Sequence, residues 1–299
     1  MSRRLRLAAA QYDLVAPATF ADWAARQEQW VSTAVEQGAE LLVFPEYGAM
    51  ELAALTGRGG AVQASFDAVS EAWDEANAVH RALAMKHGVT LVSGSGPQRR
   101  AGQTHNVAHV FGPRGRVARY DKIMPTPWER DPGGMAGGRD LMVFDTGRVK
   151  VGLVICYDIG FPLLARALAE AGAEVILTPS NTETDWGYWR GGRGAMARAL
   201  ENQCYVVQVP TVGASDFAAV AMNVGAAGVF APSDQGFPAG GVVALGEMNR
   251  PGWIHATLDL DLLAAVRATG NVQTFRHWAE QPGAGPLPAA GLIDMAAAG

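Results

Sequence analysis

Short runs of apolar and β-branched residues alternate along the chain with longer segments whose apolar residues recur every three or four positions. The short runs predict buried strands, and the longer segments predict amphipathic helices. Predicted strands cover residues 5–11, 41–44, 90–93, 106–111, 117–120, 141–144, 150–155, 175–177, 205–209, 225–230, 241–245 and 253–258. A first helix is predicted from Thr19 or Asp22 to Gly38, and further helices cover residues 70–87, 163–172, 187–202 and 261–269. Strand–helix alternation mixed with hairpins predicts an α/β fold that contains both parallel and antiparallel strand pairs.

No linker divides the chain, so we expect a single domain over residues 1–282. From residue 283 to 299 the chain is rich in Gly, Ala and Pro and lacks a packing pattern, which predicts a flexible tail or one that contacts another subunit. Residues 123–139 contain three Pro and four Gly without periodicity and predict a long loop. Met124 and Trp128 are bulky and apolar, so we expect this loop to be ordered, and long ordered loops are usually functional.

Composition and charge limit the classes of protein that this sequence encodes. With 49% apolar and 18% charged residues among 299, the chain predicts a globular protein with a large core. The net charge of −5 argues against a nucleic-acid surface, and no apolar run reaches the length of about 18 residues that a membrane span needs. Two cysteines cannot form a disulfide framework and no secretory signal is evident, so we expect a cytoplasmic protein. The six histidines are scattered, which predicts no metal site.

Glu46, Lys122 and Cys156 each follow a predicted strand, and the carboxyl ends of strands are where α/β sheets place their chemistry. A glutamate can take the proton of a thiol, and a lysine can stabilise both a thiolate and an oxyanion. The N–H of Tyr157 is a second candidate oxyanion donor. These groups suffice for acyl transfer from an amide or for addition to a nitrile. Spacing alone does not bring them together, and a buried structural cysteine and a surface glutamate remain open at this point.

Three segments resemble the motifs of the nitrilase superfamily of carbon–nitrogen hydrolases, in the same order: F-P-E-Y (44–47), D-K-I-M-P-T-P-W-E-R (121–130) and V-I-C-Y-D-I-G-F-P (154–162). The resemblance also includes the opening strand, Asn106 and residues 197–207, and it extends to about residue 259. It implies a four-layer α-β-β-α sandwich with mixed sheets, assembled as a homodimer or higher homo-oligomer. It implies no metal and no organic cofactor.

The resemblance also assigns roles to the matched residues. By motif match, Glu46 is the general base, Lys122 is the cation that stabilises the oxyanion, and Cys156 is the nucleophile. Glu129, seven residues after Lys122, matches a second glutamate that orients the lysine or the attacking water. For Glu129, a solvated charge on the loop is the alternative.

The motifs disagree about the branch of the superfamily. Tyr157 and Asp158 resemble the amidase and carbamoylase branches, whereas K-I-M-P-T-P-W-E-R (122–130) resembles the nitrilase version of the lysine motif. Leu163 stands where amidases commonly have Glu, and Gly160 replaces the Arg of ω-amidase-like members. We favour hydrolysis of an amide or N-carbamoyl compound. A nitrilase, a catalytically silent binding or scaffold homologue, and an N-acyltransferase, whose branch usually carries membrane spans, are the alternatives.

Aromatic and polar residues just past the strand ends or in the long loop are candidates for binding a small-molecule substrate: Tyr47, Trp128, Tyr157, Asn181, Trp186 and Trp189. Their number predicts a narrow, partly apolar pocket. For Trp186 we prefer packing in the core. A solvated or salt-bridged helix face is preferred over carboxylate binding for Arg190, Arg193 and Arg198. We expect Cys204 to be buried and inert, and His105 and His109 to be structural.

Overall fold

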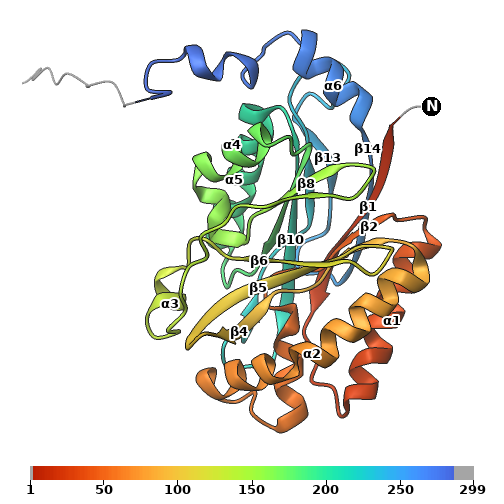
Figure 1. Ribbon diagram of the computed structural model, residues 1–299, viewed down its shortest axis with the longest axis vertical. Helices are drawn as coiled ribbons and strands as arrows, with labels where there is room; N and C mark the ends of the chain where they lie inside the picture. Colours follow the sequence, from red (N-terminus) through yellow and green to blue (C-terminus); the bar gives the residue numbers. More distant parts are fainter. Residues whose placement is uncertain (1–2, 286–299) are drawn as a thin grey trace, which may run out of the picture.

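The computed structural model describes residues 3–285. Two β-sheets lie face to face, and helices cover the outer face of each, so the molecule has four layers (Figure 1). The expected mixed α/β sandwich is confirmed. No helix among residues 3–285 combines the length and the apolar character that crossing a membrane requires.

The first sheet is built around parallel strands β1, β2 and β3, to which the remaining strands add antiparallel. Helices α1 (Phe20–Glu36) and α2 (Val62–His87) cover it. Thr19 caps α1 and forms a capping box with Asp22, which decides between the two starting points that the sequence allowed. The strands are β1 (Arg4–Asp13), β2 (Leu41–Val43), β3 (Thr90–Val92), β4 (Gly96–Arg100), β5 (Gln103–Phe111), β6 (Val117–Asp121) and β14 (Gly252–Asp259).

The second sheet has parallel strands β8, β9 and β10 at its centre. Helices α4 (Pro162–Glu170) and α5 (Asp185–Asn202) cover its outer face. Strand β1 pairs with β10 through Tyr12 and Thr211, which joins both sheets into one curled sheet, and α6 (Leu260–Thr269) lies against β1. The strands are β7 (Val143–Asp145), β8 (Lys150–Leu153), β9 (Val175–Ser180), β10 (Tyr205–Ala214), β11 (Met222–Asn223), β12 (Gly228–Phe230) and β13 (Val242–Leu245).

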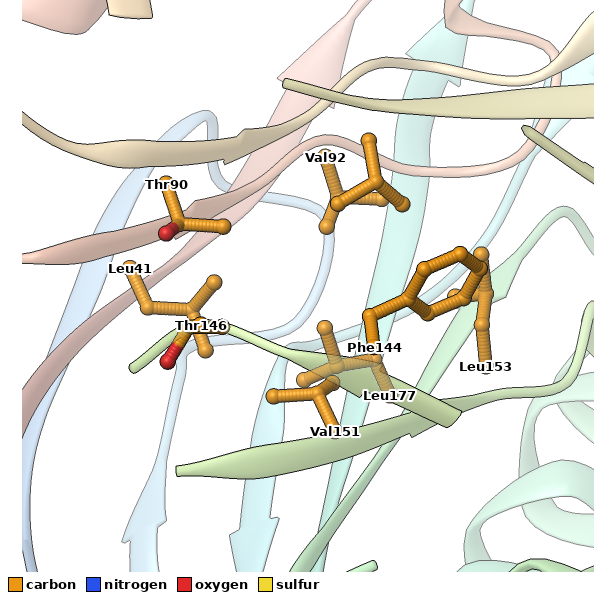
Figure 2. Close-up of a pocket in the computed structure, with 9 residues that line it drawn as sticks. Leu41, Thr90, Val92, Phe144, Thr146, Val151, Leu153 and Leu177 are labelled. Atoms are coloured by element: carbon orange, nitrogen blue, oxygen red, sulfur yellow. The ribbon is translucent and has the colours of Figure 1, made fainter. Parts of the chain in front are cut away.

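The inner faces of the two sheets form the main core. Figure 2 shows Leu41 and Val92 of the first sheet opposite Val151, Leu153 and Leu177 of the second, with only a small gap between them. All of these side chains are at least 97% buried. Because protein interiors are close-packed, this contact fixes the spacing of the two sheets and therefore the position of their strand ends.

The structure corrects three predictions about local structure. Gly96–Arg100, where a turn was expected, is strand β4, and it pairs with β5 throughout. Helix α2 begins at Val62 instead of residue 70, and residues Gly48–Thr56, for which no element was predicted, form the 3-10 helix η1. Gly and Pro around residue 96 favour turns locally, but pairing with a long neighbouring strand outweighs that preference.

The long loop at 123–139 holds one short helix, α3 (Pro127–Arg130). Thr126 caps it, and the side chain of Glu129 accepts a hydrogen bond from the N–H of Thr126 at 2.7 Å. This capping box explains why the loop is ordered. A further 3-10 helix, η3 (Arg276–Glu280), follows α6. Of the predicted tail at 283–299, residues 286–299 lie outside the described part of the chain.

Candidate active site

The three reactive residues meet at one end of the sandwich, although they come from both sheets. Glu46 follows β2, Lys122 follows β6, and Cys156 opens the 3-10 helix η2 (Cys156–Gly160) after β8. Together with Glu129 they line a cavity of about 450 Å³. This volume is within the range of small-molecule sites.

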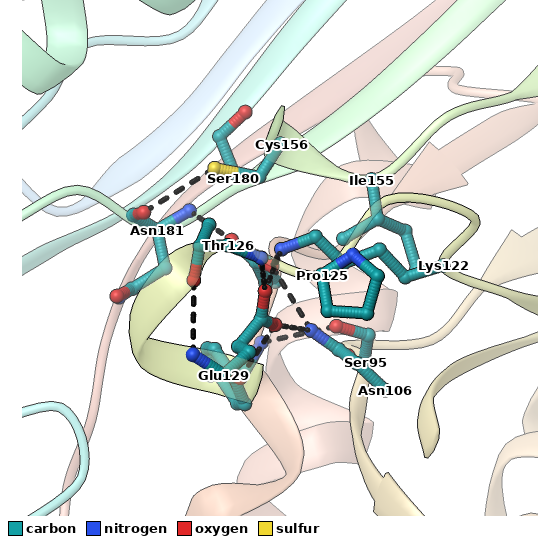
Figure 3. A network of polar contacts seen from close by, with 12 residues as sticks. Ser95, Asn106, Lys122, Pro125, Thr126, Glu129, Ile155, Cys156, Ser180 and Asn181 are labelled. Carbon is teal, nitrogen blue, oxygen red and sulfur yellow. Dashed lines mark hydrogen bonds and ion pairs between the residues drawn. The ribbon is translucent and has the colours of Figure 1, made fainter. Parts of the chain in front are cut away.

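Lys122 lies between two carboxylates. Its Nζ is 2.7 Å from Oε1 of Glu46 and 2.7 Å from Oε2 of Glu129, and all three side chains are about 98% buried or more (Figure 3). Burial lowers the pKa of Lys122, but the adjacent charges of Glu46 and Glu129 outweigh burial and raise the pKa above its ordinary value. The lysine is therefore a fixed cation at neutral pH.

Glu46 has the environment of a general base that works near neutral pH. Burial raises its pKa to about 7, Lys122 opposes this rise and Glu129 adds to it. The carboxylate also accepts hydrogen bonds from Nδ2 of Asn106 at 3.0 Å and from the backbone N–H of Asn181 at 2.7 Å. These donors aim the carboxylate while leaving it able to exchange a proton.

Glu129 is held as an anion on the other side of the lysine. Burial raises the pKa of its carboxyl, but Lys122 and the hydrogen bonds outweigh burial, and the pKa lies below its ordinary value. Oε1 of Glu129 accepts hydrogen bonds from the Tyr47 hydroxyl at 2.8 Å and from Nδ2 of Asn106 at 2.9 Å. A solvated loop charge is therefore the wrong interpretation of Glu129. Asn106 bridges both carboxylates, a role that the sequence did not reveal.

Cys156 lines the cavity and has a strained backbone conformation. Its φ is +47°, in the left-handed region that residues with a Cβ rarely adopt, and such strain clusters at functional sites. The side chain is half-buried, and Sγ lies 3.4 Å from the backbone oxygen of Asn181 (Figure 3). Burial and the neighbouring Glu46 raise the pKa of the thiol, and Lys122 opposes this. The resting sulfur is therefore a thiol that needs a base.

Four of the six candidate substrate-binding residues line the cavity: Tyr47, Trp128, Tyr157 and Asn181. Trp186 and Trp189, on the first two turns of α5, are not part of the lining. Trp186 is 78% exposed, so the preference for core packing is wrong. Its place at the second residue of α5 directs it away from the buried face of that helix.

Arg190 lines the cavity, although a solvated helix face was preferred for it. Helix α5 contributes Gly187, Arg190 and Gly191 to the lining. Because the other two are glycines, Arg190 is the residue of α5 that brings a side chain to the cavity wall. Among residues 3–285, no carboxylate forms an ion pair with it. Arg198, in contrast, pairs with Glu201 at 3.1 Å, as expected for a salt-bridged face. The helical spacing of residues 187, 190 and 191 was the signal that could have revealed Arg190.

The remaining sequence expectations concern residues away from the cavity. Cys204 is fully buried, as expected, and burial raises the pKa of its thiol to about 12. His109 is buried beside Trp73, and burial lowers the pKa of its imidazole to about 4, in keeping with a structural residue. No group of three or more His, Cys, Asp or Glu side chains within the described residues is arranged to hold a metal ion.

A four-layer sandwich that brings a cysteine, a lysine and two glutamates together at its strand ends fits the resemblance of the three sequence motifs to the nitrilase superfamily. The chain belongs to the carbon–nitrogen hydrolase family, whose model matches residues 6–268. The expectation from the three motifs is thereby confirmed.

The named relatives include hydrolases, amidases and a nitrilase from Pyrococcus abyssi (strain GE5 / Orsay). The probable hydrolase YhcX of Bacillus subtilis (strain 168) is 32% identical over 274 residues, which cover 91% of this chain and 53% of that protein. The chain thus spans about half the length of that relative. The omega-amidase NIT2 of Danio rerio is 30% identical over 264 residues, which cover 83% of this chain and 86% of that protein.

Solved structures share the fold. An amidase of the nitrilase superfamily from Nesterenkonia sp. AN1, solved as a mutant, is 25% identical, with a TM-score of 0.66 over 93% of this chain and 97% of that chain. In another mutant of that amidase, acrylamide has undergone Michael addition at the active-site cysteine.

Proposed function

We propose that this protein hydrolyses the carbon–nitrogen bond of an amide or N-carbamoyl compound through a covalent intermediate on Cys156. One observation carries the proposal: Lys122 forms ion pairs with both Glu46 and Glu129, at the cavity that Cys156 lines. A base with a pKa of about 7 beside a thiol that needs deprotonation fits nucleophilic catalysis by cysteine. The amidase names of relatives support this choice.

In the first step, Glu46 takes the proton of the Cys156 thiol, and the sulfur attacks the substrate carbonyl carbon. A C–S bond forms, and the electron pair of the C=O bond moves to oxygen. Nζ of Lys122 and the backbone N–H of Tyr157 hold this oxyanion. Glu129 keeps Lys122 oriented through the contact at 2.7 Å.

In the second step, the oxyanion collapses and the C–N bond breaks. The leaving nitrogen takes the proton from Glu46, and ammonia or an amine departs from the thioester. Water then enters, Glu46 takes a proton from it, and the hydroxide oxygen attacks the thioester carbon. The C–S bond breaks, the acid is released, and the proton on Glu46 returns to the sulfur, which restores the resting enzyme.

The cavity walls support a partly apolar acyl group. Tyr47, Trp128 and Tyr157 supply aromatic surface, and Asn181 supplies polar backbone groups beside the sulfur. Nitrile hydrolysis is the alternative, because residues 122–130 resemble the nitrilase version of the lysine motif. A silent binding protein is a further alternative, but the clustering of all four reactive side chains favours an enzyme.

A panel of primary amides, N-carbamoyl compounds and nitriles tests the reaction. We expect ammonia release from amides or carbamoyl compounds, with an intact-protein mass that shows the acyl group on the enzyme. Cys156→Ala should abolish both signals, whereas Cys204→Ala, at a buried thiol outside the cavity, should retain them. Nitrile turnover well above amide turnover would favour the alternative reaction.

Alkylation by iodoacetamide tests the nucleophile without a substrate. Peptide mass spectra at neutral pH should show Cys156 modified faster than Cys204. Equal rates at the two cysteines would contradict an activated Cys156.

We also propose that the protein forms a homo-oligomer in a reducing compartment such as the cytoplasm. The exposed apolar side chains on α5 support self-association; we name Trp186, Trp189, Met196 and Leu200 the α5 apolar stripe. Both cysteines are free thiols, which supports the reducing compartment.

A further inference from the structure

Asp158 is a buried carboxylate next to the site that the proposed reaction does not use. It lies two residues after Cys156, is fully buried, and is not among the residues that line the cavity. A buried carboxylate is costly unless hydrogen bonds compensate its lost hydration. Its contacts therefore indicate what it does.

The side chain of Asp158 accepts hydrogen bonds from two separate segments. On one side the donors are the Tyr120 hydroxyl at 2.9 Å and the backbone N–H groups of Ile123 at 3.3 Å and Met124 at 2.7 Å. On the other side the donor is the backbone N–H of Ile155 at 3.0 Å. Both carboxylate oxygens receive at least one backbone N–H.

These donors flank the two groups that must meet at the substrate. Tyr120, Ile123 and Met124 surround Lys122 in sequence, and Ile155 directly precedes Cys156. The backbone of Lys122 is itself anchored to the first sheet, because its N–H donates to the oxygen of Asn106 at 2.9 Å. The turn that holds Cys156 follows β8 of the second sheet. Asp158 therefore links the lysine-bearing end of one sheet to the cysteine-bearing turn of the other.

Only a carboxylate satisfies this set of donors. Backbone N–H groups cannot accept, so both oxygens must act as acceptors. Burial raises the pKa of Asp158, and the N–H of Ile155 and the charge of Lys122 oppose that rise. An asparagine has the same shape but would turn an NH₂ group toward at least one backbone N–H.

We propose that Asp158 is a positioning residue, which holds the Lys122 segment against the Cys156 turn so that the sulfur reaches the carbon, and the ammonium the oxygen, of the same substrate carbonyl group. This inference rests on the proposed thiol chemistry. Because Asp158 does not line the cavity, its loss changes the alignment of the reacting groups and leaves the substrate-binding walls in place. We therefore expect the loss of Asp158 to lower kcat and the reactivity of the Cys156 sulfur and to leave KM nearly unchanged.

The test is Asp158→Asn, compared with wild type for kcat and KM on the best amide of the panel, and for the rate of Cys156 alkylation by iodoacetamide. Misplacement by about 1 Å costs about 10²-fold in rate. We therefore expect kcat to fall by about 10²-fold with KM within about threefold. Alkylation at neutral pH should also slow, because a displaced Lys122 stabilises the thiolate less. Circular dichroism and thermal unfolding establish the folded fraction, to which both rates are normalised.

Tyr120→Phe is the second variant, because it removes one donor and leaves the backbone donors to Asp158 intact. We expect it to fold and to lower kcat by about fivefold with KM unchanged, since one hydrogen bond to a charged group is lost. A folded Asp158→Asn protein with wild-type kcat and alkylation rate overturns the proposal. If Asp158→Asn does not fold, an unchanged kcat and alkylation rate in Tyr120→Phe overturns it. If wild type turns over no panel substrate, the proposed function fails, and the alkylation rates alone decide on Asp158.

Discussion

At the scale of single residues, the proposed reaction makes Glu46 the group that determines how activity responds to pH. Its carboxyl must be ionised to take the thiol proton, and burial raises its pKa to about 7. As the pH falls through about 7, Glu46 becomes protonated, and kcat/KM should fall about tenfold per pH unit on the acid side. A pH–rate profile from pH 5 to 9 measures this limb. A profile that stays flat down to pH 5.5 would exclude Glu46 as the base.

In the proposed reaction Lys122 has a catalytic role as well as a structural one, so its removal should affect both activity and stability. Lys122→Ala removes an oxyanion donor, which typically costs about 10²–10³-fold in kcat. It also leaves Glu46 and Glu129 buried without their cation, and breaking a buried ion pair costs about 3–5 kcal/mol of unfolding free energy. Lys150→Ala, at an exposed lysine on β8, is the matched control and should change stability by less than about 0.5 kcal/mol. Steady-state kinetics and urea unfolding measure the two effects, and an active, stable Lys122→Ala protein would contradict both roles.

The reactive residues were predictable from sequence to different degrees, for chemical reasons. Glu46 and Cys156 each follow a short apolar run, and charged or nucleophilic side chains there stand out against the pattern. Lys122 follows a predicted strand that contains Arg119 and runs into Asp121, so its signal is weaker. Asn106 has no such signal, because an amide inside a strand differs little from any other polar strand residue. Glu46 and Glu129 lie far from Asn106 in the sequence, and only the fold brings the Asn106 side chain between them.

At the scale of elements, the strands were predicted better than the segments governed by tertiary contacts, and the longest helix, α2, begins at Val62 instead of the predicted residue 70. The strands that end at the site agree with the structure to within a few residues, since burial dictates their composition. Strand β4 was missed because its Gly and Pro favour a turn, and Gly96 is required where a Cβ would come within 2.8 Å of Ala49. Trp186 was misplaced because an aromatic residue in a helix does not reveal which face it occupies.

Helix α5 also predicts a preference among substrates. Arg190 projects from the one stretch of this helix that lines the cavity, and no ion pair neutralises it within residues 3–285. A hydrogen bond to a charged partner contributes about 1.5–3 kcal/mol, so Arg190→Gln should lower kcat/KM about 10–100-fold for an amide that bears a remote carboxylate. For a neutral amide of equal length the change should be less than about threefold. Arg193→Gln, one turn further along and outside the lining, is the matched control. An equal loss of kcat/KM on both amides would mean that Arg190 does not bind the carboxylate of the substrate.

At the scale of the whole molecule, the resemblance predicted the four layers, whereas hydrophobic periodicity predicted only a mixed α/β domain. Periodicity identifies the buried face of each strand but not which sheet packs on which. The site depends on that packing, because Glu46 and Lys122 come from one sheet and Cys156 from the other. Val92 of the first sheet faces Val151 and Leu177 of the second. These core side chains thus help to position Glu46, Lys122 and Cys156 without being part of the site.

The outer layer of the molecule carries the last prediction, which concerns assembly. The α5 apolar stripe recurs at residues 186, 189, 196 and 200, spacings that place its members along one side of the helix, and they are 78%, 52%, 38% and 45% exposed. Apolar side chains gathered on one exposed face mark an interaction surface, and a second copy of the chain presents the same face.

We expect light scattering at micromolar concentration to give at least twice the mass of 31.5 kDa. Met196→Glu combined with Leu200→Glu should shift that mass toward the monomer, because association would bury two unpaired charges. Leu245→Glu, at a 55% exposed position on β13, is the matched control and should leave the mass unchanged. A monomeric wild type, or an assembly that tolerates both glutamates on α5, would show that this stripe does not join two copies.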